Sequence, residues 1–222
     1  MVEIGNGMNR NVVALVTNMD QPLGFAIGNA LEVKEALQVL GGEGPSDLKE
    51  LCLRLAVEMI SIGLKIDSAS ARKKAEESLD SGKALAKFLD FIEAQGGDAD
   101  YLKNPSKLPS SAKTIDVISR ETGYIKGINA LELGLCAMSL GAGRETKESK
   151  LDYASGILLN AKNGDFIVKG QTLATMHLSD SLKYDPDIES RVAGSFEIVP
   201  DKTDSSTKLI LARVCESATD FY

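Results

Sequence analysis

The chain has 222 residues with 43% hydrophobic content, so it holds enough apolar material for a buried core, which excludes an intrinsically disordered protein. Its 32 Asp and Glu outweigh 25 Lys and Arg and give a formal charge of −7, which argues against a nucleic-acid-binding surface because such surfaces need clustered positive charge. The sequence has neither a signal-peptide pattern at its N-terminus nor an apolar run of the roughly 18 residues that cross a bilayer, so we expect a cytoplasmic protein without a membrane partner.

The first segment with a clear pattern is VVALVT, residues 12–17. Short runs of β-branched apolar residues are typical of buried parallel strands. The loop after this run contains Pro22 and Gly24, which predict a sharp turn just past the carboxyl end of the strand. Ligands of α/β folds bind at that end of the sheet, so the loop is a candidate part of a site.

Residues 26–95 predict helices, because apolar side chains recur there with helical spacing. The expected helices cover residues 26–40, 47–66 and 68–95, with Ser46 as the N-cap of the second and Gly82 dividing the third. The second helix is too apolar to bury only one face, so we expect it in the core. One strand cannot form a sheet alone, and residues 1–97 therefore predict an incomplete α/β domain.

A polar stretch with Pro105 and Pro109 predicts a linker over residues 98–112. After it, residues 113–222 predict an α+β domain of short strands with one helix over residues 130–140. The expected strands cover residues 114–118, 124–128, 156–159, 166–168, 172–177, 196–199 and 208–214. Turns at NGD and KG join strands within ILLNAKNGDFIVKGQTLATM, a hammerhead-like spacing that is also seen in biotinyl and lipoyl carrier domains.

The residue types that usually carry chemistry give weak signals here. The chain has one histidine, His177, and three widely spaced cysteines without a CxxC pair, so we expect neither a zinc site nor a disulfide. His177 ends an apolar strand and Cys136 lies on an apolar helix, and both are expected to be structural. Lys162 and Lys169 flank the NGD turn, but neither occupies the hairpin tip at which carrier domains hold their modified lysine, so a carrier function is disfavoured.

Four stretches carry a resemblance to a known family. The run VVALVTNMDQPLGFAIGNALEVKEALQVLGGEGPSDLKEL resembles the central segment of the pyrimidine-nucleoside and thymidine phosphorylases. The later stretches LDFIEAQGGD, GYIKGINALELGLCAMSLGAGRETKES and LDYASGILLNAKNGDFIVKGQTLATMH are similar to segments that follow in the same family. Together they cover about residues 1–178 in register, whereas residues 179–222 follow the family only loosely.

The resemblance implies a transferase that cleaves a pyrimidine nucleoside with inorganic phosphate, giving the free base and a pentose 1-phosphate. It covers only the C-terminal half of that family, whose N-terminal half carries the phosphate-binding loop, the base contacts and the dimer-forming helices. We therefore expect a C-terminal fragment or subunit that is a scaffold of the cleft, is inactive alone and does not form the family homodimer. No catalytic or cofactor-binding residue is assigned, and the expected partner is the N-terminal half in trans, with phosphate and nucleoside binding only in the complete enzyme.

The family also implies a potassium ion that takes two backbone carbonyls and one carboxylate from this segment. The matching positions are Leu23, Ala26 and Glu35, a partial site of oxygen ligands such as hard cations prefer, and no organic cofactor is expected. For Glu35, the open alternative is a solvated residue on a helix. For the chain as a whole, the open alternative is a non-catalytic binding or regulatory module that retains the fold.

Overall fold

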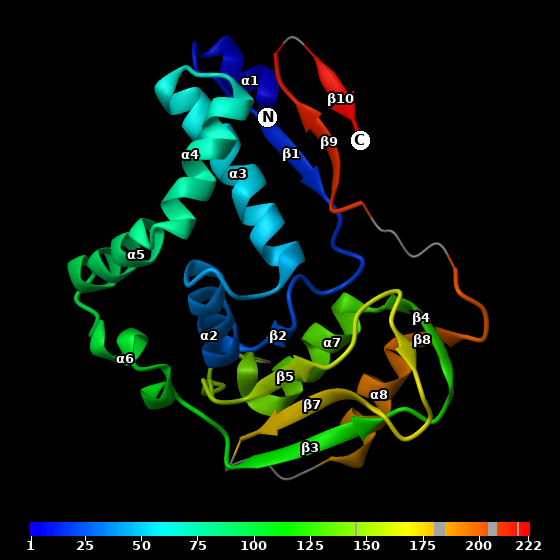
Figure 1. The fold of residues 1–222 in the computed structure, drawn as a ribbon. Coiled ribbons are helices and arrows are strands. Elements are labelled where there is room, and N and C mark those ends of the chain that lie inside the picture. The colour runs from blue at the N-terminus through cyan, green and yellow to red at the C-terminus, as the bar shows by residue number, and fades with distance from the viewer. Residues whose placement is uncertain (145, 180–184, 204–207, 217) are drawn as a thin grey trace. The chain divides into compact units, whose positions relative to one another are not determined.

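The computed structural model describes residues 1–144, 146–179, 185–203, 208–216 and 218–222. The chain forms two compact units (Figure 1). The first contains residues 1–18, 39–88 and 207–222, and the second contains residues 19–38 and 89–206. Each unit therefore combines segments that are distant along the chain, and the domain boundaries expected at residues 97 and 112 stay a prediction.

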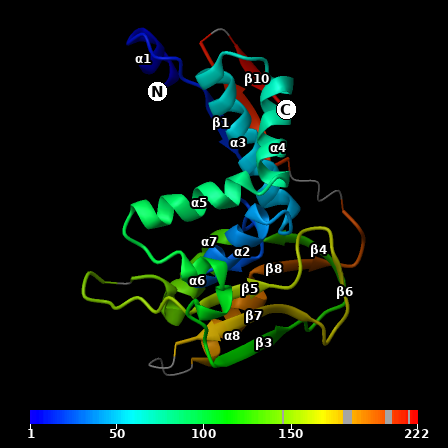
Figure 2. The same ribbon diagram turned by 60° about the vertical axis from the view of Figure 1, so that its left-hand side comes forward.

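The first unit combines a three-stranded antiparallel sheet with helices. The sheet has the order β1 (Ala14–Thr17), β9 (Ile210–Val214) and β10 (Thr219–Phe221). Helices α3 (Ser46–Leu64) and α4 (Ser68–Asp80) lie side by side in both views (Figures 1 and 2), and the short helix α1 (Val2–Gly7) precedes β1. Helix α5 (Lys83–Ala94) begins after Gly82, whose φ is +73°, so the expected division at this glycine is confirmed.

Bidentate ion pairs connect the elements of the first unit. Arg213 on β9 donates to both carboxylate oxygens of Glu58 on α3, at 2.8 and 2.9 Å. Arg72 on α4 donates to both oxygens of Glu50 on α3, at 2.9 and 2.8 Å. Because a two-point Arg–carboxylate pair fixes orientation as well as distance, α3 is held both to the sheet and to α4.

Two expectations for the first unit are wrong. Residues 12–17 do not form a buried parallel strand, because β1 pairs antiparallel with β9 and Val16 is 45% exposed. A run of β-branched residues is compatible with parallel and antiparallel sheets alike. The strand that pairs with β1 is near the C-terminus, so the composition of residues 12–17 cannot indicate the direction of pairing. Helix α3 is not buried all round, since Met59 is 67% exposed while another face buries Leu51 and Val57.

The second unit contains two antiparallel sheets. One has the order β2 (Ala26–Ile27), β5 (Gly156–Leu159), β7 (Thr172–Leu178) and β3 (Lys113–Ile118), and the other has the order β6 (Phe166–Ile167), β4 (Gly123–Ile128) and β8 (Phe196–Val199). The helical segments are α2 (Asn29–Leu40), α6 (Asp100–Lys103), η1 (Pro105–Lys107), α7 (Ala130–Ala137), η2 (Met138–Ala142) and α8 (Pro186–Gly194). Both sheets, α7 and α8 contribute to one apolar core, which includes Ile125, Leu133, Ile157, Met176 and Val192.

The strands expected between residues 114 and 199 are all present, as is the strand expected at residues 208–214, so the mixed helix-and-sheet class is confirmed. The hammerhead-like arrangement stays a prediction. The expected linker is partly helical, since it contains α6 and η1. Helix α8 was not expected, although Asp185 at its N-cap, followed by Pro186, is a sequence signal for a helix start.

The helix expected over residues 26–40 is too long at its N-terminal end. Ala26 and Ile27 pair with β5 as strand β2, and α2 begins only at Asn29. Gly28 separates the two elements with a φ of +142°, and a Cβ added there would lie 2.5 Å from the carbonyl oxygen of Ser155. Apolar spacing alone cannot reveal this break, because it depends on the close approach of a segment far along the chain.

Candidate functional site

The loop before α2 is held by a buried carboxylate. Glu35 is 7% exposed, and its Oε1 accepts hydrogen bonds from the backbone N–H groups of Phe25 at 2.8 Å and Ala26 at 3.2 Å. Gly24 has a φ of +67°, and a Cβ built on it would collide with Oε2 of Glu35. A glycine is therefore required here for two reasons, the backbone conformation and the space that the carboxylate occupies.

A lysine from the turn after β5 binds the same loop. The ammonium of Lys162 donates to the carbonyl oxygens of Pro22 at 2.5 Å and Gly24 at 2.7 Å. It also lies 5.5 Å from the centre of the Phe25 ring, within the range of a cation–π contact. The loop thus has a cationic side chain on its carbonyls and an anionic side chain on its N–H groups. Local sequence gave no signal for this role of Lys162, because the acceptors lie 138 and 140 residues away.

The three residues expected to bind potassium come from this loop and the helix that follows it. Leu23 belongs to the loop, Ala26 is the first residue of β2, and Glu35 reaches back to the loop and to β2 from the second turn of α2. The alternative that Glu35 is a solvated helix residue is wrong, because its side chain is buried against the loop backbone. The contacts that its Oε1 makes are to the backbone N–H groups of Phe25 and Ala26, and the potassium site at Leu23, Ala26 and Glu35 stays a prediction.

The LGAGR stretch also contacts the start of α2. The side-chain amide of Asn29 donates to the carbonyl oxygen of Ala142 at 2.9 Å. Gly141 has a φ of +105°, which turns the chain at the end of η2, and its carbonyl accepts the N–H of Asp152 at 2.9 Å. Arg144 is exposed. The stretch therefore forms a turn that is hydrogen-bonded to the start of α2.

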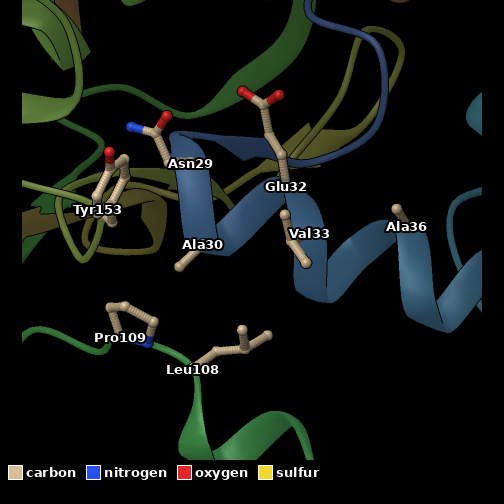
Figure 3. Close-up of a pocket in the computed structure, with 8 residues that line it drawn as sticks. All are labelled: Asn29, Ala30, Glu32, Val33, Ala36, Leu108, Pro109 and Tyr153. Carbon is tan, nitrogen blue, oxygen red and sulfur yellow. The ribbon is translucent and has the colours of Figure 1, made fainter. Parts of the chain in front are cut away.

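A pocket of about 660 Å³ opens beside α2. Figure 3 shows Ala30 and Val33 facing Leu108 and Pro109, whereas the carboxylate of Glu32 points away from them. None of the eight residues that line this pocket is a lysine or arginine. The lining is therefore mostly apolar and supplies no positive charge of its own, although the ammonium of Lys34 donates to the carbonyl of Pro109 at 3.2 Å.

The other singled-out residues have structural surroundings. His177 lies on β7 opposite Thr114 and Gly156, and burial, with a smaller effect of nearby Lys34, lowers its pKa. Cys136 is fully buried, and burial raises the pKa of its thiol, which disfavours the reactive thiolate. Both findings agree with the structural roles expected from the sequence.

Two searches of the described ranges gave negative results. No helix within them is long and apolar enough to cross a membrane. No group of three or more His, Cys, Asp and Glu side chains in the same ranges is arranged to hold a metal ion.

Residues 124–198, which form much of the second unit, match the model of the pyrimidine nucleoside phosphorylase C-terminal domain. Pyrimidine-nucleoside phosphorylases from Bacillus subtilis and Geobacillus stearothermophilus are 52% and 48% identical to the chain over 178 residues, and that from a strain of Staphylococcus aureus is 44% identical. Each match covers 80% of this chain and 41% of the relative, so the chain spans about two fifths of the length of these curated relatives.

These matches define a class for one part of the chain, since residues 124–198 are similar to the pyrimidine nucleoside phosphorylase C-terminal domain. More particularly, the resemblance to the pyrimidine-nucleoside phosphorylase family is confirmed, and it applies to part of the length of those proteins.

Proposed function

We propose that this chain provides the C-terminal part of a pyrimidine-nucleoside phosphorylase. In that reaction a phosphate oxygen bonds to C1′ of the pentose, the glycosidic C–N bond breaks, and the pyrimidine leaves with the bonding electrons and takes up a proton. The observation that carries the proposal is the 52% identity over 178 residues to the Bacillus subtilis enzyme. Identity at this level supports a shared fold and a shared position within the enzyme.

The role proposed for these residues is to shape and stiffen one side of the cleft. The loop from Pro22 to Ala26, held by Glu35 and Lys162, is the best-defined feature for this role. Leu23 and Ala26 would offer carbonyl oxygens, and Glu35 its carboxylate, to a potassium ion. Such an ion would supply positive charge beside the phosphate. Contacts to the phosphate and the base would come from the N-terminal half that the family resemblance implies.

The test is a phosphorolysis assay on the 222-residue polypeptide, first alone and then with the remaining N-terminal part of the Bacillus subtilis relative. Alone, it should not convert thymidine or uridine, because stabilisation of the transition state needs contacts that the proposal assigns to the other part. The reconstituted mixture should release base and pentose 1-phosphate.

Host phosphorylase is controlled by a mock purification from cells without the gene. Turnover by the polypeptide alone, above that control, would contradict the scaffold role. A stable complex of the two parts without turnover would instead favour the non-catalytic binding or regulatory module.

A further inference from the structure

The turn that carries Lys162 is fixed to strand β4 by backbone hydrogen bonds. The backbone N–H of Lys162 donates to Oδ2 of Asp165 at 2.8 Å, which closes the turn. Gly164 donates its N–H to the carbonyl of Ile125 at 2.7 Å, and Ile125 donates back to the carbonyl of Asp165 at 2.9 Å. Because Ile125 is a fully buried residue of β4, the lysine projects from a base that is anchored in the core.

The ammonium of Lys162 binds the loop as a small monovalent cation would. Its two acceptors are the backbone carbonyls of Pro22 and Gly24, two buried residues separated by one position. An ammonium group and a potassium ion have similar size and the same charge, and both are stabilised by carbonyl oxygens. These two carbonyls differ from those of Leu23 and Ala26, which the family resemblance assigns to potassium.

We propose that Lys162 is a positioning residue whose ammonium acts as a built-in monovalent cation and holds the Pro22–Ala26 loop in place without a bound ion. Removing the ammonium while keeping the rest of the turn leaves two carbonyls that an external ammonium or potassium ion can bind. The proposal concerns the folded loop and does not depend on the phosphorylase function, so its test requires no activity.

The test compares Lys162→Met, which keeps the aliphatic stem, with Lys162→Arg, which keeps a positive charge, and with the control Lys169→Met in the next turn. Melting temperatures are measured in choline, potassium and ammonium chloride at one ionic strength. The unmodified chain and Lys169→Met should respond alike to the three salts, and that shared response, which includes any potassium bound at Leu23, Ala26 and Glu35, is the baseline for the other variants. Lys162→Met should melt lower in choline and recover in potassium or ammonium. Lys162→Arg should show less destabilisation and less response to these ions.

Amide hydrogen exchange measures the opening of the loop itself, whereas a melting temperature reports on the whole chain. In choline, exchange of the Phe25 and Ala26 amides should be about tenfold or more faster in Lys162→Met, because charge-assisted hydrogen bonds that order the loop are lost. Exchange at Met176, a fully buried residue of the central strand β7, reports on the core and should change less. Lys162→Gln serves as a second variant if the methionine chain does not fold.

Two results would overturn the proposal. One is an unchanged melting temperature and unchanged loop exchange in Lys162→Met, which would mean that the carbonyls do not need the ammonium. The other is destabilisation that potassium and ammonium fail to reverse, which would mean that the tethered ammonium acts in a way that a free cation cannot replace, such as its contact with the Phe25 ring.

Discussion

Replacing Glu35 tests whether one buried carboxylate holds the loop before α2. Its Oε1 accepts two backbone N–H groups, at 2.8 and 3.2 Å, from a side chain that is 7% exposed. A buried donor left without its acceptor costs about 1–3 kcal/mol, so Glu35→Ala should lower the free energy of unfolding by about 3 kcal/mol after some relief by water. Glu35→Gln keeps an acceptor oxygen but loses the charge, and should cost about 1–2 kcal/mol.

Urea unfolding followed by far-ultraviolet circular dichroism measures these differences. Two residues of the same helix serve as controls. Gln38 is exposed, so Gln38→Ala should change the free energy of unfolding by less than about 0.5 kcal/mol. Glu32 is exposed and accepts one N–H, that of Gly28 at 3.0 Å, so Glu32→Ala should cost about 1 kcal/mol. If Glu35→Ala lowers the free energy of unfolding no more than Glu32→Ala does, the reasoning is refuted, because burial and the second hydrogen bond would then add no stability.

Two further predictions concern titratable groups. Burial, followed by the charge of Lys34, lowers the pKa of His177 from the ordinary value of 6.5, so the unfolded chain takes up a proton at a higher pH than the folded chain does. The free energy of unfolding should therefore decrease as the pH falls below about 6.5, and this decrease should be shallower in His177→Gln. Urea titrations at several pH values measure both. If the free energy of unfolding changes equally with pH in the two proteins, His177 does not cause the decrease. Burial raises the pKa of both thiols, but Cys136 is fully buried whereas Cys52 is exposed, so a thiol reagent should modify Cys52 in the folded chain and Cys136 only after unfolding. Peptide mass spectrometry measures this, and equal labelling rates of the two cysteines in the folded chain would show that the core is open at α7.

The candidate site was predictable only in part. Pro22 and Gly24 indicated a sharp turn after the first strand, and the family resemblance singled out Leu23, Ala26 and Glu35. The residues around Glu35 could not reveal its burial, because Lys34 and Glu32 beside it are typical of a solvated helix face. Burial follows from the way the loop folds back over the helix, which places N–H groups from nine and ten residues away on the carboxylate.

The sequence by itself determined the local features of this protein. Residue patterns located strands β3 to β8 and helices α3 to α5, and long runs of similar residues indicated the family resemblance. These signals are local, since a strand or helix shows its period in its own residues.

Only the tertiary structure decided which distant segments meet. In the tertiary structure β1 pairs with β9 in the antiparallel direction, and Ala26 and Ile27 form a strand beside β5. Lys162 contacts the carbonyls of the loop before α2. The physical reason is that backbone N–H and C=O groups are alike in every residue, so local sequence indicates that they need partners but does not specify which partners they find.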